Sequence, residues 1–186
     1  MQFTNEKKIQ LAKQDKSDKG DWDKHIYNLL RKINAKKDYY TTSSCSGRTV
    51  LIKGKDKKQE GLFLFRTHEK ISFVELKNKV KDAAHKYKGI VYFKQESCIL
   101  HVACSSLDKA QEILDKAKLA GWKKSGIIAS KRRFVAELSS TEKIELPVTN
   151  KGKILVSDEL LRLLVKEANR KLERGWEKIK KLGRML

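Results

Sequence analysis

The sequence predicts an α+β fold: a single domain in which helices pack on a mixed, mostly antiparallel sheet. Three observations support this prediction. Four segments carry apolar residues at helical spacing. Between them lie short runs of β-branched, aromatic and other apolar residues, separated by polar or glycine-containing turns. The paired-glycine loop of a doubly wound, Rossmann-type cofactor site is absent. At 186 residues the chain fits one domain with an ordinary core, so we expect a single domain over residues 1–186.

The helices follow from apolar periodicity and from capping residues. We expect helices over residues 21–36, 72–88 and 105–121, and a long C-terminal helix that begins at residue 157. The second begins with a capping box, in which the Ser72 side chain and Glu75 satisfy free backbone N–H groups, and Gly89 ends it.

The strands follow from extended apolar runs between turn signals. We expect strands over residues 39–44, 48–53, 62–68, 90–95, 99–104, 126–130 and 134–138, with shorter ones near Ile144 and Ile154. The polar turn over residues 54–58 indicates that the second and third strands form an antiparallel hairpin. In the strand over residues 99–104, Leu100 and Val102 share an apolar face, so His101 points to the other face.

The charge balance indicates a polyanionic partner. The chain has 43 Lys plus Arg against 23 Asp plus Glu, a net charge of +20. A membrane surface is the rival polyanion, but the longest apolar runs are far shorter than a spanning helix requires. The N-terminal residues do not form a signal peptide, and we expect a cytoplasmic protein.

Cysteine and histidine spacing gives no metal motif. The three cysteines lack C-x-x-C spacing, and the four histidines are scattered along the chain. We therefore expect neither a disulfide framework nor a bound metal.

The segment over residues 39–48 combines hydroxyl groups, a thiol, a glycine and an arginine between two expected strands. Its candidate ligand-binding residues are Ser43, Ser44, Cys45, Gly47 and Arg48. Hydroxyl and backbone N–H donors beside a permanently charged guanidinium suit a ligand carboxylate, sugar or phosphate. The alternative is a serine-rich turn without a ligand.

This segment, Tyr-Tyr-Thr-Thr-Ser-Ser-Cys-Ser-Gly-Arg, resembles the signature of the tRNA wybutosine-synthesizing methyltransferase family, the third enzyme of that pathway, with archaeal members. Further similar elements lie at residues 15–23 (D-x-S-x-K-G-x-x-D), 99–102 (I-L-H-V), 121–127 (G-W-x-x-S-G-I), 133–137 (R-x-x-x-E) and 145–147 (E-x-P). The resemblance covers roughly residues 15–169. One departure is the lack of a proline near residues 97–98, which leaves the role of Glu96 open.

The resemblance implies a function. It implies methyl transfer from S-adenosyl-L-methionine to the four-position ring nitrogen of aminocarboxypropyl-demethylwyosine, next to the anticodon of phenylalanine-specific tRNA. The segment over residues 43–48 is the expected cofactor site. The alternative function is a non-catalytic basic RNA-binding module, and the oligomeric state stays open.

The candidate catalytic base is His101, with His68 as the second choice. A ring N–H must lose its proton during methyl transfer, and a positioned histidine can take it. Without the resemblance, a structural histidine is the simpler interpretation of His101. Ser125 and Gly126 are candidates for close approach to the cofactor or base, or form a helix-to-strand turn.

Several other residues carry two interpretations each. One interpretation of Asp15, Asp18 and Asp23 is that they bind cationic groups of the ligand, and the other is that they cap a helix. For Tyr39 or Tyr40, the two interpretations are stacking on the target base and a place in the core. We interpret Cys45 as a packing or positioning residue, because direct methyl transfer needs no covalent enzyme intermediate. The candidate RNA contacts are Lys24, Arg31, Arg162, Lys166 and Arg170, unless these belong to solvated helix faces.

Overall fold

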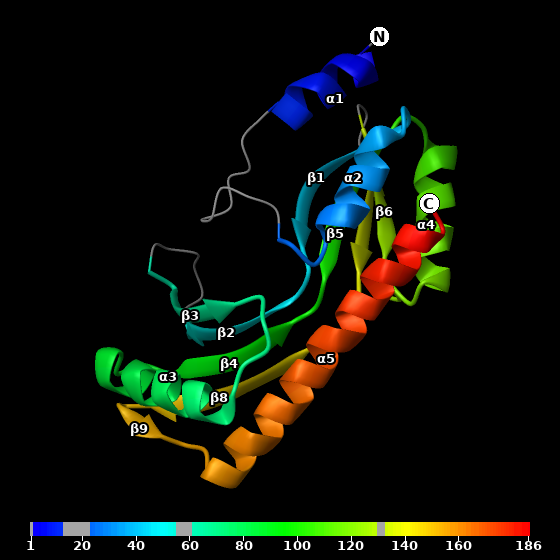
Figure 1. The fold of residues 1–186 in the computed structure, drawn as a ribbon. Coiled ribbons are helices and arrows are strands. Elements are labelled where there is room, and N and C mark those ends of the chain that lie inside the picture. Colours follow the sequence, from blue (N-terminus) through cyan, green and yellow to red (C-terminus); the bar gives the residue numbers. More distant parts are fainter. Residues whose placement is uncertain (1, 13–22, 55–60, 130–132) are drawn as a thin grey trace. The chain divides into compact units, whose positions relative to one another are not determined.

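The computed structural model describes residues 2–12, 23–54, 61–129 and 133–186 (Figure 1). The chain forms two compact units, each assembled from separate stretches of sequence. The first unit combines Met1–Ser46, Cys98–Thr141 and Gly175–Leu186, and the second combines Gly47–Ser97 and Glu142–Arg174. The chain therefore passes from one unit to the other four times, after Ser46, Ser97, Thr141 and Arg174.

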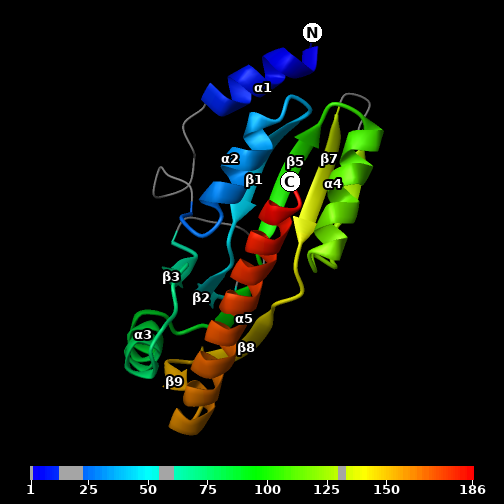
Figure 2. The same ribbon diagram turned by 45° about the vertical axis from the view of Figure 1, so that its right-hand side comes forward.

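The first unit contains a four-stranded antiparallel sheet with the order β1-β5-β7-β6. Its strands are β1 (Tyr39–Cys45), β5 (Ile99–Cys104), β6 (Gly126–Ala129) and β7 (Phe134–Ser139). Its helices are α1 (Gln2–Ala12), α2 (Tyr27–Ala35), α4 (Leu107–Leu119) and the last turns of α5 (Asp158–Arg184). In Figures 1 and 2, α2 lies along β1 and α4 lies along β7.

The core of the first unit forms on one face of this sheet. Leu100 and Val102 of β5 and Leu138 of β7 are inaccessible to solvent and pack with apolar residues of α2, α4 and the end of α5. Trp122, also fully buried, donates its indole N–H to the carbonyl oxygen of Lys178 in α5 (3.2 Å). The C-terminal turns of α5 are thus part of this core.

The second unit contains a five-stranded antiparallel sheet with the order β3-β2-β4-β8-β9. Its strands are β2 (Arg48–Lys53), β3 (Phe63–Thr67), β4 (Val91–Glu96), β8 (Ile144–Asn150) and β9 (Lys153–Ile154). Helix α3 (Phe73–Lys86) and the first part of α5 complete this unit. Its core contains Leu51 and Phe93 from the sheet, Leu76 and Val80 from α3, and Leu161 from α5.

Most expected elements are present. Ser72 and Ser106 accept hydrogen bonds from the backbone N–H groups of Glu75 and Lys109, as the N-caps of α3 and α4. Strands β2 and β3 pair as the predicted hairpin. All strand pairings among the described residues are antiparallel, which confirms the mostly antiparallel α+β prediction. The strands form two sheets, whereas one was expected.

Other features differ from expectation. Helix α1 was not expected, because its apolar residues do not recur on one face, and none of its residues is buried. The first expected helix begins at Tyr27 rather than at residue 21, and residues 21–22 lie outside the described residues. Strand β1 pairs with β5, a pairing that the sequence did not specify. The expectation of one domain over residues 1–186 stays a prediction.

None of the helices within the described residues combines the length and the apolar character needed to cross a bilayer.

Candidate functional site

A row of four residues crosses the face of the first unit's sheet that lies opposite its core. Ser43 of β1 pairs with His101 of β5, His101 pairs with Glu137 of β7, and Glu137 pairs with Gly126 of β6. Directly paired residues in antiparallel strands point to the same face. We call Ser43, His101, Glu137 and Gly126 the polar row.

Hydrogen bonds connect the first three members of the polar row. Ser43 Oγ lies 2.5 Å from His101 Nδ1, and Glu137 Oε2 lies 2.7 Å from His101 Nε2. An ionised glutamate only accepts hydrogen bonds, so Nε2 carries a proton and donates to Glu137. In the neutral imidazole, Nδ1 is then the acceptor for the Ser43 hydroxyl. The His101 side chain is 26 % exposed, so the row is open to solvent.

The polar row ends at Gly126, where the sheet face is open. A Cβ built on Gly126 would meet no atom within 4 Å. Glycine is therefore not required there by packing among the described residues. The missing side chain leaves room beside the Glu137 carboxylate.

The Ser125 hydroxyl group makes two hydrogen bonds within the protein. Its Oγ donates to the carbonyl oxygen of Trp122 (2.6 Å) and accepts from the backbone N–H of Ser139 (3.1 Å). These bonds fix the turn that leads from α4 into β6. For Ser125, the structure supports the alternative of a helix-to-strand turn.

Next to the polar row, the same sheet face is covered by α1. The Tyr40 ring lies 5.2 Å from the Phe3 ring, centroid to centroid, and its hydroxyl donates to Glu6 (3.2 Å). Burial raises the pKa of Tyr40, so the phenol stays neutral at physiological pH. Tyr39 and Tyr40 are 5 % and 1 % exposed, which supports the core alternative over stacking on a target base.

The segment that follows β1 holds an unpaired hydroxyl group. Asp23 accepts hydrogen bonds from the backbone N–H groups of Ser46 (2.9 Å) and His25 (3.2 Å), so it fixes both this segment and the turn before α2. The Ser46 hydroxyl is buried and has no hydrogen-bond partner among the described residues. A buried polar group without a partner costs free energy, which a bound ligand can recover. Asp15 and Asp18 lie outside the described residues.

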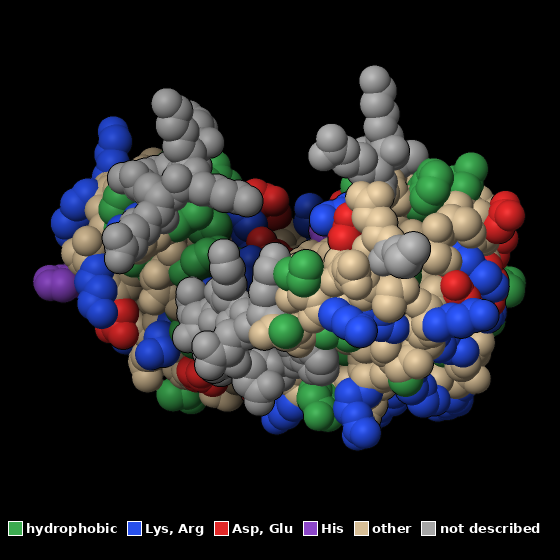
Figure 3. All heavy atoms as spheres, turned by 90° about the horizontal axis from the view of Figure 1, so that it is seen from above, with side chains coloured by type: hydrophobic (Ala, Val, Ile, Leu, Met, Phe, Trp, Pro, Cys, Tyr) green, Lys and Arg blue, Asp and Glu red, His purple; other side chains and the backbone are tan. Residues whose placement is uncertain are grey.

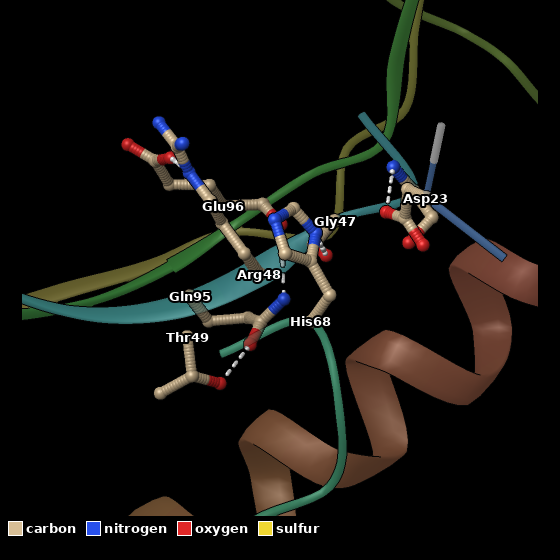
Figure 4. A network of polar contacts seen from close by, with 8 residues as sticks. Asp23, Gly47, Arg48, Thr49, His68, Gln95 and Glu96 are labelled. Carbon is tan, nitrogen blue, oxygen red and sulfur yellow. Dashed lines mark hydrogen bonds and ion pairs between the residues drawn. The ribbon is translucent and has the colours of Figure 1, made fainter. Parts of the chain in front are cut away.

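In the second unit, Arg48 is paired within the protein. Its Nε donates to Glu96 Oε2 at 2.5 Å, and its guanidinium lies 5.0 Å from the centre of the Phe63 ring. Glu96, whose role the sequence left open, therefore orients Arg48. The bond uses only one of the five guanidinium N–H donors, so Arg48 can still bind a second carboxylate. Figure 4 shows Arg48 and Glu96.

The neighbours of Arg48 are also hydrogen-bonded. Thr49 donates to Gln95 (2.8 Å), and the Gln95 amide donates to the carbonyl oxygen of Glu96 (2.9 Å), which connects β2 and β4 (Figure 4). His68 donates from Nδ1 to the carbonyl oxygen of Gly47 at 3.1 Å. Gly47 adopts a φ of 97°, a conformation that favours glycine. His68 is thus tied to the backbone of the segment that contains Arg48.

The cysteines have different environments. Cys45 is half-buried on β1, whereas Cys98 and Cys104 are buried in the core. Burial raises the pKa of the Cys104 thiol to about 12, so it stays protonated at neutral pH. Cys104 is therefore an inert packing residue.

The candidate RNA contacts lie in both units. In the first unit, Lys24 is exposed just before α2 and Arg31 is exposed within it. In the second unit, the exposed candidates lie on α5 and are Arg162, Lys166 and Arg170. Arg162 lies over the Phe73 ring (3.8 Å to its centre), and Arg170 pairs with Glu167. In Figure 3, Lys and Arg side chains are spread widely over the visible face. Charge alone therefore does not select one RNA-binding surface.

Sequence reasoning missed one member of the polar row. Glu137 was recognised only as part of the R-x-x-x-E element, without a role. The available signal was its place on an expected strand, but its partner depends on the pairing of β5 with β7, which local sequence does not specify.

Comparison with known proteins gives a consistent result. The family model described as Methyltransferase TYW3 matches residues 5–186. The tRNA(Phe) 7-((3-amino-3-carboxypropyl)-4-demethylwyosine(37)-N(4))-methyltransferase of Archaeoglobus fulgidus is 37% identical over 100% of this chain and 92% of its own length. The tRNA wybutosine-synthesizing protein 3 homolog of Xenopus laevis is 36% identical over 95% of this chain and 71% of its own length.

Solved structures agree with this relationship. A protein from Pyrococcus horikoshii is 33% identical, with a TM-score of 0.80 over 89% of this chain and 84% of its own. A protein from Aeropyrum pernix is 27% identical, with a TM-score of 0.74 over 88% of this chain and 96% of its own. The family match spans nearly the whole sequence and includes every member of the polar row. The chain belongs to the TYW3 methyltransferase family.

Proposed function

We propose that this protein methylates the four-position ring nitrogen of 7-(3-amino-3-carboxypropyl)-4-demethylwyosine in tRNA(Phe), with S-adenosyl-L-methionine as the methyl donor. The observation that carries the reaction class is the family match over residues 5–186. Relatives that cover nearly the whole chain carry the name of this reaction. A non-catalytic RNA-binding module is not favoured, because it gives no reason for this relationship to enzymes.

The polar row supplies the group that takes the proton. The ring nitrogen of the substrate must lose its N–H proton as the new N–CH₃ bond forms. Because Glu137 holds the Nε2 proton of His101, the lone pair lies on Nδ1, beside the Ser43 hydroxyl. His101 can take the proton directly, when the substrate replaces Ser43 at Nδ1, or through Ser43, whose own proton then passes to Nδ1.

The same arrangement of serine, histidine and carboxylate also occurs in enzymes with a nucleophilic serine. Here the serine needs no covalent role, because the methyl group passes directly from donor to nitrogen. Glu137 acts as a positioning residue that fixes the tautomer of His101 and stabilises its protonated form. His68 stays the second candidate base, since its Nδ1 donates to Gly47 and its Nε2 is the nitrogen that can accept a proton.

The end of β1 and the residues that follow it carry groups that suit the proposed cofactor. S-adenosyl-L-methionine supplies an electrophilic methyl group on a sulfonium cation. The Ser46 hydroxyl, which has no partner among the described residues, offers a donor for its carboxylate or ribose oxygens. Ser43 Oγ gives its proton to His101 and can accept from a ribose hydroxyl, whereas Ser44 pairs with Leu100 and so lies on the other face of the sheet. The Glu137 carboxylate, 40 % exposed, offers a negative charge to a cation. Cys45, Gly47 and Arg48 remain proposed cofactor contacts from the same segment, with Arg48 oriented by Glu96.

The test compares two substrates for labelled methyl transfer. tRNA(Phe) that carries the aminocarboxypropyl-demethylwyosine base at position 37 should be methylated, and an unmodified transcript of the same tRNA should not. Both should bind, because phosphate contacts supply affinity whereas the acceptor nitrogen exists only in the tricyclic base. Equal incorporation into both tRNAs would overturn the proposed substrate and leave a methyltransferase with another target.

A further inference from the structure

A groove runs along the first unit between α2 and the last turns of α5, separate from the polar row. Its volume is about 910 Å³. On α2 it is lined by residues that recur every three or four positions, from Asn28 to Ala35, and on α5 by residues at the same spacing, from Trp176 to Arg184. Each helix therefore presents one continuous stripe to the groove.

The groove is strongly basic. Its cationic lining residues are Lys24, Arg31, Lys32, Lys180 and Arg184. No acidic side chain lines it among the described residues. Lys32 of α2 donates to the carbonyl oxygen of Gly183 in α5 (2.5 Å), so the two walls are in contact at one end. Cationic residues therefore line the groove on both walls. A groove lined by one sign of charge concentrates ligands of the opposite sign.

The groove also contains a stacked aromatic pair. The His25 and Trp176 rings lie 3.8 Å apart, centroid to centroid, at an interplanar angle of 9°. Both residues line the groove and are half-buried. Flat aromatic surface beside cationic side chains is the combination that single-stranded and looped RNA segments bind, because bases stack while phosphates pair with Lys and Arg.

We propose that this groove binds the phosphodiester backbone of the tRNA substrate, away from the reacting base. The inference rests on the proposed function for the identity of the RNA. The α2 wall from Asn28 to Ala35 extends roughly 10 Å, long enough to follow a short stretch of RNA backbone. The methyl donor fits this groove poorly, because its sulfonium would be repelled by the cationic lining. The groove thus supplies affinity and orientation, while the polar row supplies the chemistry.

The experiment measures binding of an unmodified tRNA(Phe) transcript, without cofactor, at several salt concentrations. The variant Lys180→Gln/Arg184→Gln removes two exposed charges from the α5 wall, and Arg31→Gln removes one from the α2 wall. The double variant should weaken binding roughly 10- to 30-fold near 0.15 M salt and lower the slope of log affinity against log salt by about 2. Arg31→Gln should lower this slope by about 1.

The matched control is Lys118→Gln/Lys123→Gln, which removes two exposed charges of the same unit outside the groove. It should change affinity less than about twofold, because no contact is lost. Thermal unfolding checks that all variants are folded. The proposal would be overturned if the groove variants bind tRNA as the wild type does, or if they lose no more affinity than the control. It would also be overturned if they lose affinity for S-adenosyl-L-methionine and not for tRNA. Because the assay needs no methyl transfer, it is independent of whether the proposed reaction is correct.

Discussion

The two faces of the four-stranded sheet serve different purposes, although they are built from alternating residues of the same strands. Leu100 points into the core and is inaccessible, whereas its neighbour His101 lies on the opposite face and bonds to Ser43 and Glu137. Strand alternation thus places a stability residue beside a proposed catalytic residue without a loop between them. We therefore expect a substitution of Leu100 to lower stability and a substitution of the neighbouring His101 to lower the rate of methyl transfer.

The largest effect is expected on the outer face. His101→Ala should lower the single-turnover rate of methyl transfer by about 10²- to 10⁴-fold, the usual contribution of a general base. Cofactor and tRNA affinity should change much less, because a base acts mainly in the transition state. Rapid-quench measurement with saturating precursor tRNA gives the rate, and calorimetry gives the affinities.

The control for this prediction is Glu137→Gln, which keeps an acceptor for Nε2–H but removes the charge. Its rate should fall less than that of His101→Ala. If His101→Ala reduces binding and rate equally, His101 serves binding or folding, and the two faces do not differ as proposed.

On the inner face, Leu100→Ala should lower the free energy of unfolding by about 2–5 kcal/mol, because it leaves a cavity in a closely packed core. Urea titration followed by circular dichroism measures the loss. Under conditions where the variant stays folded, its methyl-transfer rate should remain close to that of the wild type. A rate loss comparable to that of His101→Ala would mean that stability and chemistry are not divided between the faces.

The smallest effect is expected at the end of the polar row. Gly126→Val adds a side chain where a Cβ meets no atom within 4 Å, so stability should change by less than about 0.5 kcal/mol. If the substrate or cofactor lies beside Glu137, the ratio kcat/KM should fall about tenfold, which corresponds to about 1.4 kcal/mol. The control is Ile128→Val, on the same strand and face and 54% exposed. Equal activity of both variants would place the ligand away from Gly126.

The sequence predicts features that depend on neighbouring residues. The face of His101 follows from the alternation of Leu100 and Val102, and the N-caps Ser72 and Ser106 lie where their motifs place them. The role of Glu137 could not be predicted, because it depends on which strand pairs with β5 and in which register. The pairing of β1 with β5 rather than with β2 is also non-local, since it joins residues more than fifty positions apart.

The division of the strands into two sheets could not be predicted from the sequence for the same reason. Strands β1 and β2 are separated by only Ser46 and Gly47, which in a sequence resembles a tight hairpin. In the structure these two residues carry the chain from one unit to the other, so each strand finds its partners elsewhere. The segment over residues 43–48 was chosen as a candidate site by its composition, and it stays a prediction. The salt bridge that holds Arg48 could not be predicted, because it depends on the pairing of β2 with β4.

The interleaved segments have a consequence for how the protein folds during synthesis. Ile179 and Leu182 are buried in the core of the first unit, and the carbonyl oxygen of Lys178 accepts the Trp122 indole N–H. The strands that carry the polar row are therefore translated well before the helix turns that complete their core. The core of the first unit is incomplete until residues 175–186 have left the ribosome, so apolar strand surface of the nascent chain stays exposed until then.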